Sequence, residues 1–108
     1  MSHITPAELA LWQRGGLAHT LIDVRRAAAR QGDGGQIAGG QWHDPARWLD
    51  WKDSIPIDGL VVLYCVHGRE VSQGLVAALR VMGVDARYLA GGIEAWKVAG
   101  EAVQALGA

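Results

Sequence analysis

A continuous apolar run near the middle of the chain places the strongest constraint on its fold. The run Leu60–Tyr64 holds five apolar or aromatic side chains in succession, with no polar residue among them. A strand with one face in water alternates apolar and polar residues, whereas an unbroken run is typical of a strand buried on both faces of a parallel sheet. The run is also far too short to span a bilayer.

Strand-like and helix-like segments alternate along the rest of the chain. Further β-rich runs predict strands over residues 20–24 and 86–89. Thr5-Pro6-Ala7-Glu8 has the pattern of a capping box, which predicts a helix start. More helices are predicted over residues 25–31, from Asp44 to before Pro56, over 71–82 and over 93–98, with a glycine-rich loop over 32–40. The alternation predicts a parallel sheet with helices on both faces.

Length and composition narrow the class of protein. A chain of 108 residues, 50% hydrophobic and 19% charged, suits one folded domain over residues 1–108. Its net charge of -1 offers no basic surface for nucleic acid and no polybasic patch for a membrane, so neither partner is expected. The single cysteine excludes an intramolecular disulfide, and the first residues lack the pattern of a secretory signal. We therefore expect a cytoplasmic protein.

The single cysteine, Cys65, directly follows the buried strand and precedes a predicted helix by a short polar turn. Ligands bind beyond the carboxyl ends of the strands in such sheets. Successive N–H groups of a glycine-containing turn, together with those at the start of a helix, would bind an anion and stabilise Cys65 as a thiolate. A cysteine that only fills the core would fit the strand but not the polar turn. The turn consists of Val66, His67, Gly68, Arg69, Glu70 and Val71.

Four segments, taken together, match a known family. Each segment is short, but all four occur in the family's order and at suitable spacing. On this basis the chain resembles the rhodanese-like sulfurtransferases, particularly the small single-domain thiosulfate sulfurtransferases. The four segments are Leu21-Ile22-Asp23-Val24-Arg25, Gly35-Gln36-Ile37-Ala38-Gly39-Gly40, Cys65-Val66-His67-Gly68 and Leu89-Ala90-Gly91-Gly92-Ile93-Glu94-Ala95-Trp96.

The resemblance implies a three-layer α/β/α fold with a mainly parallel sheet of about five strands. It also implies that Cys65 is the nucleophile and carries the transferred sulfur as a persulfide. The donor would be a small sulfur-containing anion such as thiosulfate, or a persulfide. The acceptor would be cyanide or a thiol, with a protein sulfur carrier as a further partner. No cofactor and no metal are implied, and we expect a monomer or a weak dimer.

The residues after Cys65 have separate predicted roles. Backbone N–H groups of residues 66–71 would hydrogen-bond the terminal sulfur of the persulfide. Arg69 is the side chain predicted to steer an anionic donor, and His67 is expected to contribute mainly its backbone amide. Glu70 departs from what an anion site needs, because its charge would disfavour the dianion thiosulfate. The apolar positions of residues 71–82 are expected to anchor the following helix in the core.

Asp23 and Arg25 are predicted to support the site from a neighbouring strand. They follow the β-rich run over residues 20–24 and would reach the same edge of the sheet as Cys65. They could orient a substrate, but the favoured interpretation is that they brace nearby loops through hydrogen bonds.

Two alternative functions use the same cysteine. One is a sulfur-relay or regulatory module that acts on a protein partner. The other is a Cys-dependent phosphatase or arsenate reductase, which clamps a tetrahedral oxyanion with the arginine of a Cys-x5-Arg loop. The sixth residue after Cys65 is Val71, and Arg69 comes at the fourth position. The sequence therefore favours sulfur chemistry over oxyanion chemistry.

Overall fold

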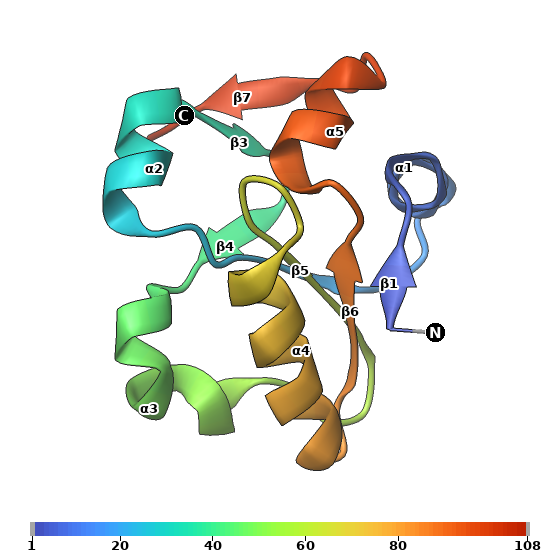
Figure 1. Ribbon diagram of the computed structural model, residues 1–108. Helices are drawn as coiled ribbons and strands as arrows, with labels where there is room; N and C mark the ends of the chain where they lie inside the picture. Colours follow the sequence, from blue (N-terminus) through green and yellow to red (C-terminus); the bar gives the residue numbers. More distant parts are fainter. Residues whose placement is uncertain (1, 108) are drawn as a thin grey trace.

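A parallel sheet of five strands forms the centre of the computed structural model, which describes residues 2–107. The strands lie in the order β1-β6-β5-β2-β4, and every neighbouring pair is parallel. Figure 1 shows a separate antiparallel pair, β3 and β7, near the end of the sheet to which β6 points. The strands are β1 (His3–Ile4), β2 (Thr20–Asp23), β3 (Gly35–Ile37), β4 (Gly40–Trp42), β5 (Leu60–Tyr64), β6 (Asp85–Leu89) and β7 (Val103–Ala105).

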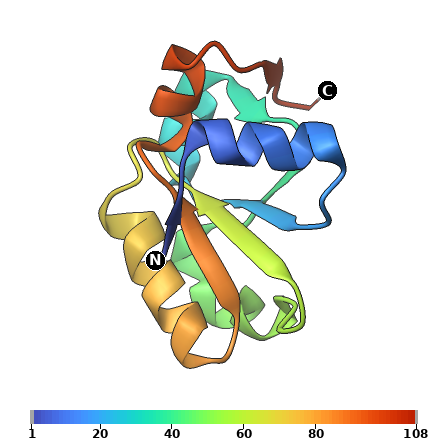
Figure 2. The ribbon, with the colours of Figure 1, turned by 90° about the vertical axis from the view of Figure 1, so that its right-hand side faces the viewer.

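Helices cover both faces of this sheet, as Figures 1 and 2 show. One face packs against α1 and α5, and the other against α3 and α4. The sequence prediction of a three-layer α/β/α fold with a five-stranded parallel sheet is therefore confirmed. The helices are α1 (Pro6–Gly15), α2 (Ala27–Asp33), α3 (Trp48–Trp51), α4 (Glu70–Val81) and α5 (Gly92–Val98), and short 3₁₀ turns over Pro45–Arg47 and Lys52–Ser54 flank α3.

Strand β5 is buried on both faces, which explains its unbroken apolar sequence. Val61 and Leu63 belong to the core under α3 and α4. Val62 and Tyr64 alternate with them and belong to the core under α1 and α5. Both cores meet the same strand, so the position of its last residue, and of Cys65 after it, is fixed from two sides.

The capping box at the start of α1 forms as predicted. The Glu8 N–H donates to Thr5 Oγ1 at 3.1 Å, and the Thr5 N–H donates to Glu8 Oε1 at 3.0 Å. In α4, Val76 and Leu79 are buried as expected. Met82 is an exception to the predicted apolar stripe, because it follows the last residue of the helix and is 38% exposed.

Three sequence predictions differ from the structure between β2 and β5. The predicted loop over residues 32–40 contains β3, because this short strand pairs with the distant β7. The helix predicted over residues 25–31 begins two residues later, since the Arg25 N–H bonds to the Asp23 carboxylate and its side chain is buried. The single helix predicted after Asp44 is divided into α3 and its flanking 3₁₀ turns. Within residues 2–107, no helix combines the length and hydrophobicity needed to cross a bilayer.

His43 makes the stability of this region dependent on pH. It follows β4, and its ring stacks on Trp51 with 5.0 Å between the ring centroids. Burial lowers the pKa of His43 below its usual value of 6.5. The neutral ring therefore contributes stability that is complete above the unfolded pKa and is lost as the pH falls through the folded pKa.

We expect the free energy of unfolding to decrease more between pH 7 and pH 5 in the native protein than in a His43→Gln variant. Urea unfolding at several pH values measures both slopes. The other histidines are common to the two proteins, so their contributions cancel. Equal slopes would contradict the assignment to His43.

Candidate active site

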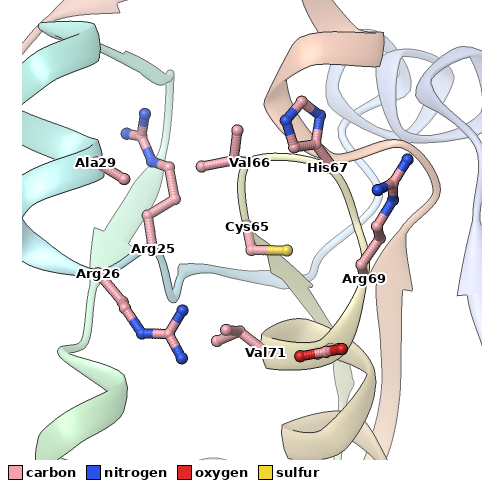
Figure 3. A pocket seen from close by; sticks show the side chains of 9 residues that line it. Arg25, Arg26, Ala29, Cys65, Val66, His67, Arg69 and Val71 are labelled. Carbon is pink, nitrogen blue, oxygen red and sulfur yellow. The ribbon is translucent and has the colours of Figure 1, made fainter.

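Cys65 lies at the carboxyl end of β5, at the base of a surface hollow. This hollow, which we call the Cys65 hollow, has a volume of about 360 Å³ and lies between the start of α2 and the loop that leads into α4. Cys65 itself is only 7% exposed. Figure 3 shows the lining side chains, which belong to Arg25, Arg26, Ala29, Cys65, Val66, His67, Arg69, Glu70 and Val71. Asp23 is buried and does not line the hollow.

The carbonyl groups of the loop after Cys65 are used by neighbouring elements. The Cys65 carbonyl accepts the N–H of Ile93 at 3.0 Å, and the Val66 carbonyl accepts the N–H of Glu94 at 3.1 Å. Both donors lie in the first turn of α5. The Gly68 carbonyl accepts the side-chain amide of Gln73 at 2.8 Å. The loop is therefore tied to α5 and α4 through its oxygen atoms.

The N–H groups of the same loop are left for a ligand. In the part of the chain that the structure describes, no amide N–H of residues 66–72 has a protein acceptor. The last of these N–H groups belong to the first turn of α4, where the helix dipole adds positive potential. Successive unpaired N–H groups can bind an anion, and here they belong to the seven residues that directly follow Cys65. The geometry therefore supports the anion site predicted from the sequence.

Two glycines allow the loop to lie directly against α5. Gly68 has a φ of +67°, and a Cβ atom there would come within 2.5 Å of the Leu89 carbonyl oxygen. Gly92 has a φ of +63°, and a Cβ atom there would collide with the carbonyl oxygens of Cys65 and Val66. The Gly91-Gly92 segment noted in the sequence thus acts as the surface on which the Cys65 loop rests.

Ser72 contacts the cysteine directly and was missed by the sequence analysis. Its Oγ lies 3.1 Å from Cys65 Sγ, and the residue is fully buried. A signal was present, because Ser72 precedes the buried Val76 and Leu79 by four and seven positions and so lies on the same helical face. A buried serine on that face needs a hydrogen-bond partner, and the thiol provides one.

Two exposed arginines, Arg26 and Arg69, line the Cys65 hollow. In Figure 3 the Arg26 side chain extends from the start of α2 toward Val71, and Arg69 lies on the far side of the loop with its guanidinium group directed away from the sulfur of Cys65. Arg69 was predicted to line the site, whereas Arg26 was missed. The sequence did contain an indication of Arg26, because this residue comes just after Asp23 and Arg25. These residues follow a strand that pairs with β5. Glu70 also lines the hollow, and its negative charge partly offsets the positive charges of Arg26 and Arg69.

Arg25 lines the hollow, but its guanidinium group forms hydrogen bonds with other parts of the protein. Its Nη2 donates to Asp23 Oδ2 at 2.8 Å and to the Gly35 carbonyl at 2.8 Å. The side chain is completely buried, and Figure 3 shows the guanidinium directed away from the sulfur of Cys65. Asp23 and Arg25 therefore join the end of β2 to β3 through hydrogen bonds.

A second ion pair connects α2 to α5. Asp33 pairs with Lys97 and also accepts the N–H of Gly35 at 3.0 Å. Burial acts to raise the pKa of Asp33, but these two donors and the nearby Arg25 outweigh it, so the pKa lies below its usual value. Within residues 2–107, no cluster of three or more His, Cys, Asp or Glu side chains is arranged to hold a metal ion.

Comparisons with known proteins agree with this geometry. The sequence matches the Rhodanese-like domain family over residues 5–99. A rhodanese-related protein from Thermoplasma volcanium superimposes with a TM-score of 0.83 at 24% identity, covering 96% of this chain and 98% of the other. No curated protein matches the sequence significantly.

Two further solved structures share 25% identity with the chain. A rhodanese-like domain protein from Staphylococcus aureus has a TM-score of 0.79, with 89% of this chain and 91% of the other covered. A protein of unknown function from Rhodopseudomonas palustris, described as a possible tyrosine phosphatase, has a TM-score of 0.79, with coverage of 96% and 85%.

The Asp23–Arg25 pair generates a prediction about stability. Replacing Arg25 with methionine removes the hydrogen-bonded counter-ion of the buried Asp23 carboxylate and leaves only the longer contact with Arg30 at 3.6 Å, so Arg25→Met should destabilise the protein by about 3 kcal/mol. The neighbouring variant Arg26→Met is the matched control, because Arg26 is exposed and should change stability by no more than about 0.5 kcal/mol. Urea unfolding compares the two. Similar stabilities would show that the buried pair does not brace the fold.

Proposed function

Because the chain belongs to the rhodanese-like family, we propose that it is a sulfurtransferase in which Cys65 accepts a sulfane sulfur and passes it on. The observation that carries the proposal is the row of unpaired N–H groups beside Cys65. A thiolate and a persulfide are both monoanions, so one set of donors stabilises both states of the cycle. The reducing cytoplasm is the proposed location.

In the first step, the Cys65 thiolate attacks the outer sulfur of thiosulfate. The S–S bond of the donor breaks, and its electron pair leaves with sulfite. The product is a Cys65 persulfide whose negative charge has moved one sulfur outward. An organic persulfide donor reacts in the same way, with a thiolate as the leaving group. No proton needs to move in this step, so no general base is required.

In the second step, the acceptor attacks the outer sulfur of the persulfide. Cyanide becomes thiocyanate, or a thiolate becomes a persulfide, and Cys65 leaves as a thiolate. Ser72 contributes here, because its hydroxyl lies within hydrogen-bonding distance of Sγ and can donate to the charge that returns there. The two steps predict ping-pong kinetics.

The charged residues that line the Cys65 hollow influence which sulfur donor the site selects. Arg26 and Arg69 attract an anion, whereas Glu70 repels it. We propose that Arg69 steers the donor, with Arg26 as a second cation on the opposite side. Each of these charges acts twice as strongly on dianionic thiosulfate as on a monoanionic persulfide at the same distance. Glu70 therefore opposes the two arginines more strongly for thiosulfate than for a persulfide, and its removal distinguishes the two donors.

A sulfur relay between proteins is the second candidate function. Glu70 repels a protein persulfide, which is a monoanion, less than it repels dianionic thiosulfate at the same distance. A relay module would turn over thiosulfate and cyanide slowly but accept sulfur from the persulfide of a partner. Phosphatase chemistry, suggested for the Rhodopseudomonas palustris protein, receives no support from the loop, because Val71 stands where a Cys-x5-Arg loop needs its arginine.

Intact-protein mass spectrometry tests the proposed function most directly. After exposure to thiosulfate or an organic persulfide, the protein should gain the mass of one sulfur atom, and cyanide should remove it. Cys65→Ser should retain the fold, lose the mass gain and lower turnover by roughly a thousand-fold or more. Retained turnover in Cys65→Ser would contradict the role of this residue.

Glu70 provides a test of donor selectivity. Glu70→Gln removes one negative charge from the hollow, so the KM for thiosulfate should fall about five-fold, and by more than the KM for an organic persulfide. Steady-state kinetics with both donors and a fixed acceptor measure the difference. Equal changes for the two donors would remove Glu70 from donor selection.

A further inference from the structure

Strand β7 has a neighbouring strand on one side only. Within residues 2–107 it pairs with β3 alone, and Figure 1 shows this pair at the end of the molecule opposite α3. Val103 is 41% exposed, and Ala105 is also exposed. No residue of β7 lines the Cys65 hollow, so this strand has no part in the proposed reaction.

The backbone groups of Val103 and Ala105 point away from β3. The N–H of Leu106 donates to the Gly34 carbonyl at 3.0 Å, so residue 106 faces β3. In an antiparallel pair the backbone groups of successive residues point to alternate sides of the strand. Gln104 therefore also faces β3, whereas the N–H and carbonyl groups of the residues on either side of it face outward.

The contacts of β3 agree with this alternation. Gly35 and Ile37 are the residues of β3 that lie opposite the two outward-facing residues of β7. The Ile37 N–H donates to the Tyr64 hydroxyl at 3.2 Å, and the Gly35 N–H donates to the Asp33 carboxylate at 3.0 Å. Neither N–H is directed to β7. The two N–H and two carbonyl groups on the outer edge of β7 thus have no hydrogen-bond partner within residues 2–107.

This edge lacks the features that keep an edge strand unpaired. Such strands usually carry a charged residue or a proline, or are very short. Residues 102–107 include no charged residue and no proline, whereas β1, at one edge of the central sheet, has only two residues. The net charge of the chain is -1, so two copies repel each other only weakly. Nothing in this segment opposes the addition of a further strand.

We propose that β7 pairs antiparallel with β7 of a second copy of this chain and forms a weak symmetric dimer. Gln104 would lie on the two-fold axis, opposite its own counterpart. The N–H and carbonyl groups of Val103 would bond to the carbonyl and N–H groups of Ala105 in the second copy. All four outward groups of each edge would then be paired, within a four-stranded sheet. This inference goes beyond the proposed function and does not depend on it.

The symmetry of the edge is the reason for choosing a second copy as the partner. The outward groups lie on both sides of Gln104, so the edge is complementary to itself in the antiparallel direction. In this register Ala102 faces Leu106 and Glu101 faces Gly107, so no like charges meet. A contact limited to these strands falls below the roughly 1,200 Å² of a stable interface, so we expect a dissociation constant of about 0.1–1 mM.

Sedimentation equilibrium in reducing buffer tests the dimer directly. From about 20 μM to about 1 mM protein, the average mass should rise from that of one chain toward that of two. Over the same range, the amide NMR signals that shift most should belong to residues 102–106. A single-chain mass at every concentration would overturn the proposal and leave the edge to a strand of another protein. Shifts centred on another surface would overturn it as well.

Ala105→Pro removes one outward N–H and places a ring where the second copy would lie. The N–H does not bond to β3 and the preceding residue is extended, so the variant should keep its fold. We expect the dissociation constant to rise about ten-fold or more. Ala105→Thr is the matched control, because it keeps the N–H, and its constant should stay within about two-fold of native. Equal constants for the two variants would contradict pairing through β7.

Gln104→Lys tests the register without removing a backbone group. Two lysines would face each other across the two-fold axis, so the dissociation constant should rise about five-fold. Gln41→Lys is the control, because Gln41 is an exposed glutamine of another strand, β4, and the change in charge is the same. The control should keep the native constant. An equal effect of both substitutions would overturn the placement of Gln104 on the axis.

Discussion

The attachment of the Cys65 loop to the first turn of α5 determines what this site can do. The carbonyl groups of Cys65 and Val66 accept N–H groups that the start of a helix would otherwise leave unpaired. This arrangement gives two N–H groups of the first turn of α5 their acceptors, and it directs the carbonyl oxygens of Cys65 and Val66 toward α5. The N–H groups of residues 66–72 remain without protein acceptors in the described chain. An anion beside Cys65 is the natural partner for them.

The attachment requires the two backbones to approach more closely than side chains permit. Gly68 and Gly92 meet this requirement from opposite sides of the contact, and both have a positive φ. Neither glycine touches the reacting sulfur, yet a side chain at either position would separate the loop from α5. The ends of the loop are held as firmly, since β5 is buried on both faces and α4 is fixed by Val76 and Leu79. The backbone of the proposed anion site is therefore fixed by packing, and not by charged side chains.

The parts of this fold that depend on local sequence could be predicted, and the parts that depend on distant pairing could not. The bounds of β5 follow from its composition, and the start of α1 follows from its capping box. Strand β3 escaped prediction because its three residues are recognisable only through their pairing with β7, which lies far along the chain. The start of α2 was misplaced because the buried Arg25 holds the chain extended through its contacts with Asp23.

The same division applies to the candidate site. Cys65 and its loop were found because strand, polar turn and helix follow one another in sequence. Ser72 and Arg26 were missed because their importance comes from where the fold brings their side chains. Arg26 follows β2, and it lines the same hollow as Cys65 only because β2 and β5 are neighbours in the sheet. A run of adjacent arginines does not reveal which of them is buried in an ion pair and which is exposed.

The ion pairs of the fold determine the net charge of the residues that line the Cys65 hollow, and this charge influences which group the hollow can hold. Arg25 is paired with Asp23, so the remaining charged residues of the lining are Arg26, Arg69 and Glu70. Two arginines against one glutamate leave a formal charge of +1, which the thiolate of the proposed reaction would neutralise. The proposed persulfide would carry the same single negative charge, so the proposed sulfur transfer would not disturb this balance. A reaction that placed a dianionic group on Cys65 would leave excess negative charge beside Glu70, in a site whose other donors are uncharged N–H groups. The charges of the hollow thus suit a group that carries one negative charge before and after transfer, as the sulfane sulfur of the proposed reaction would.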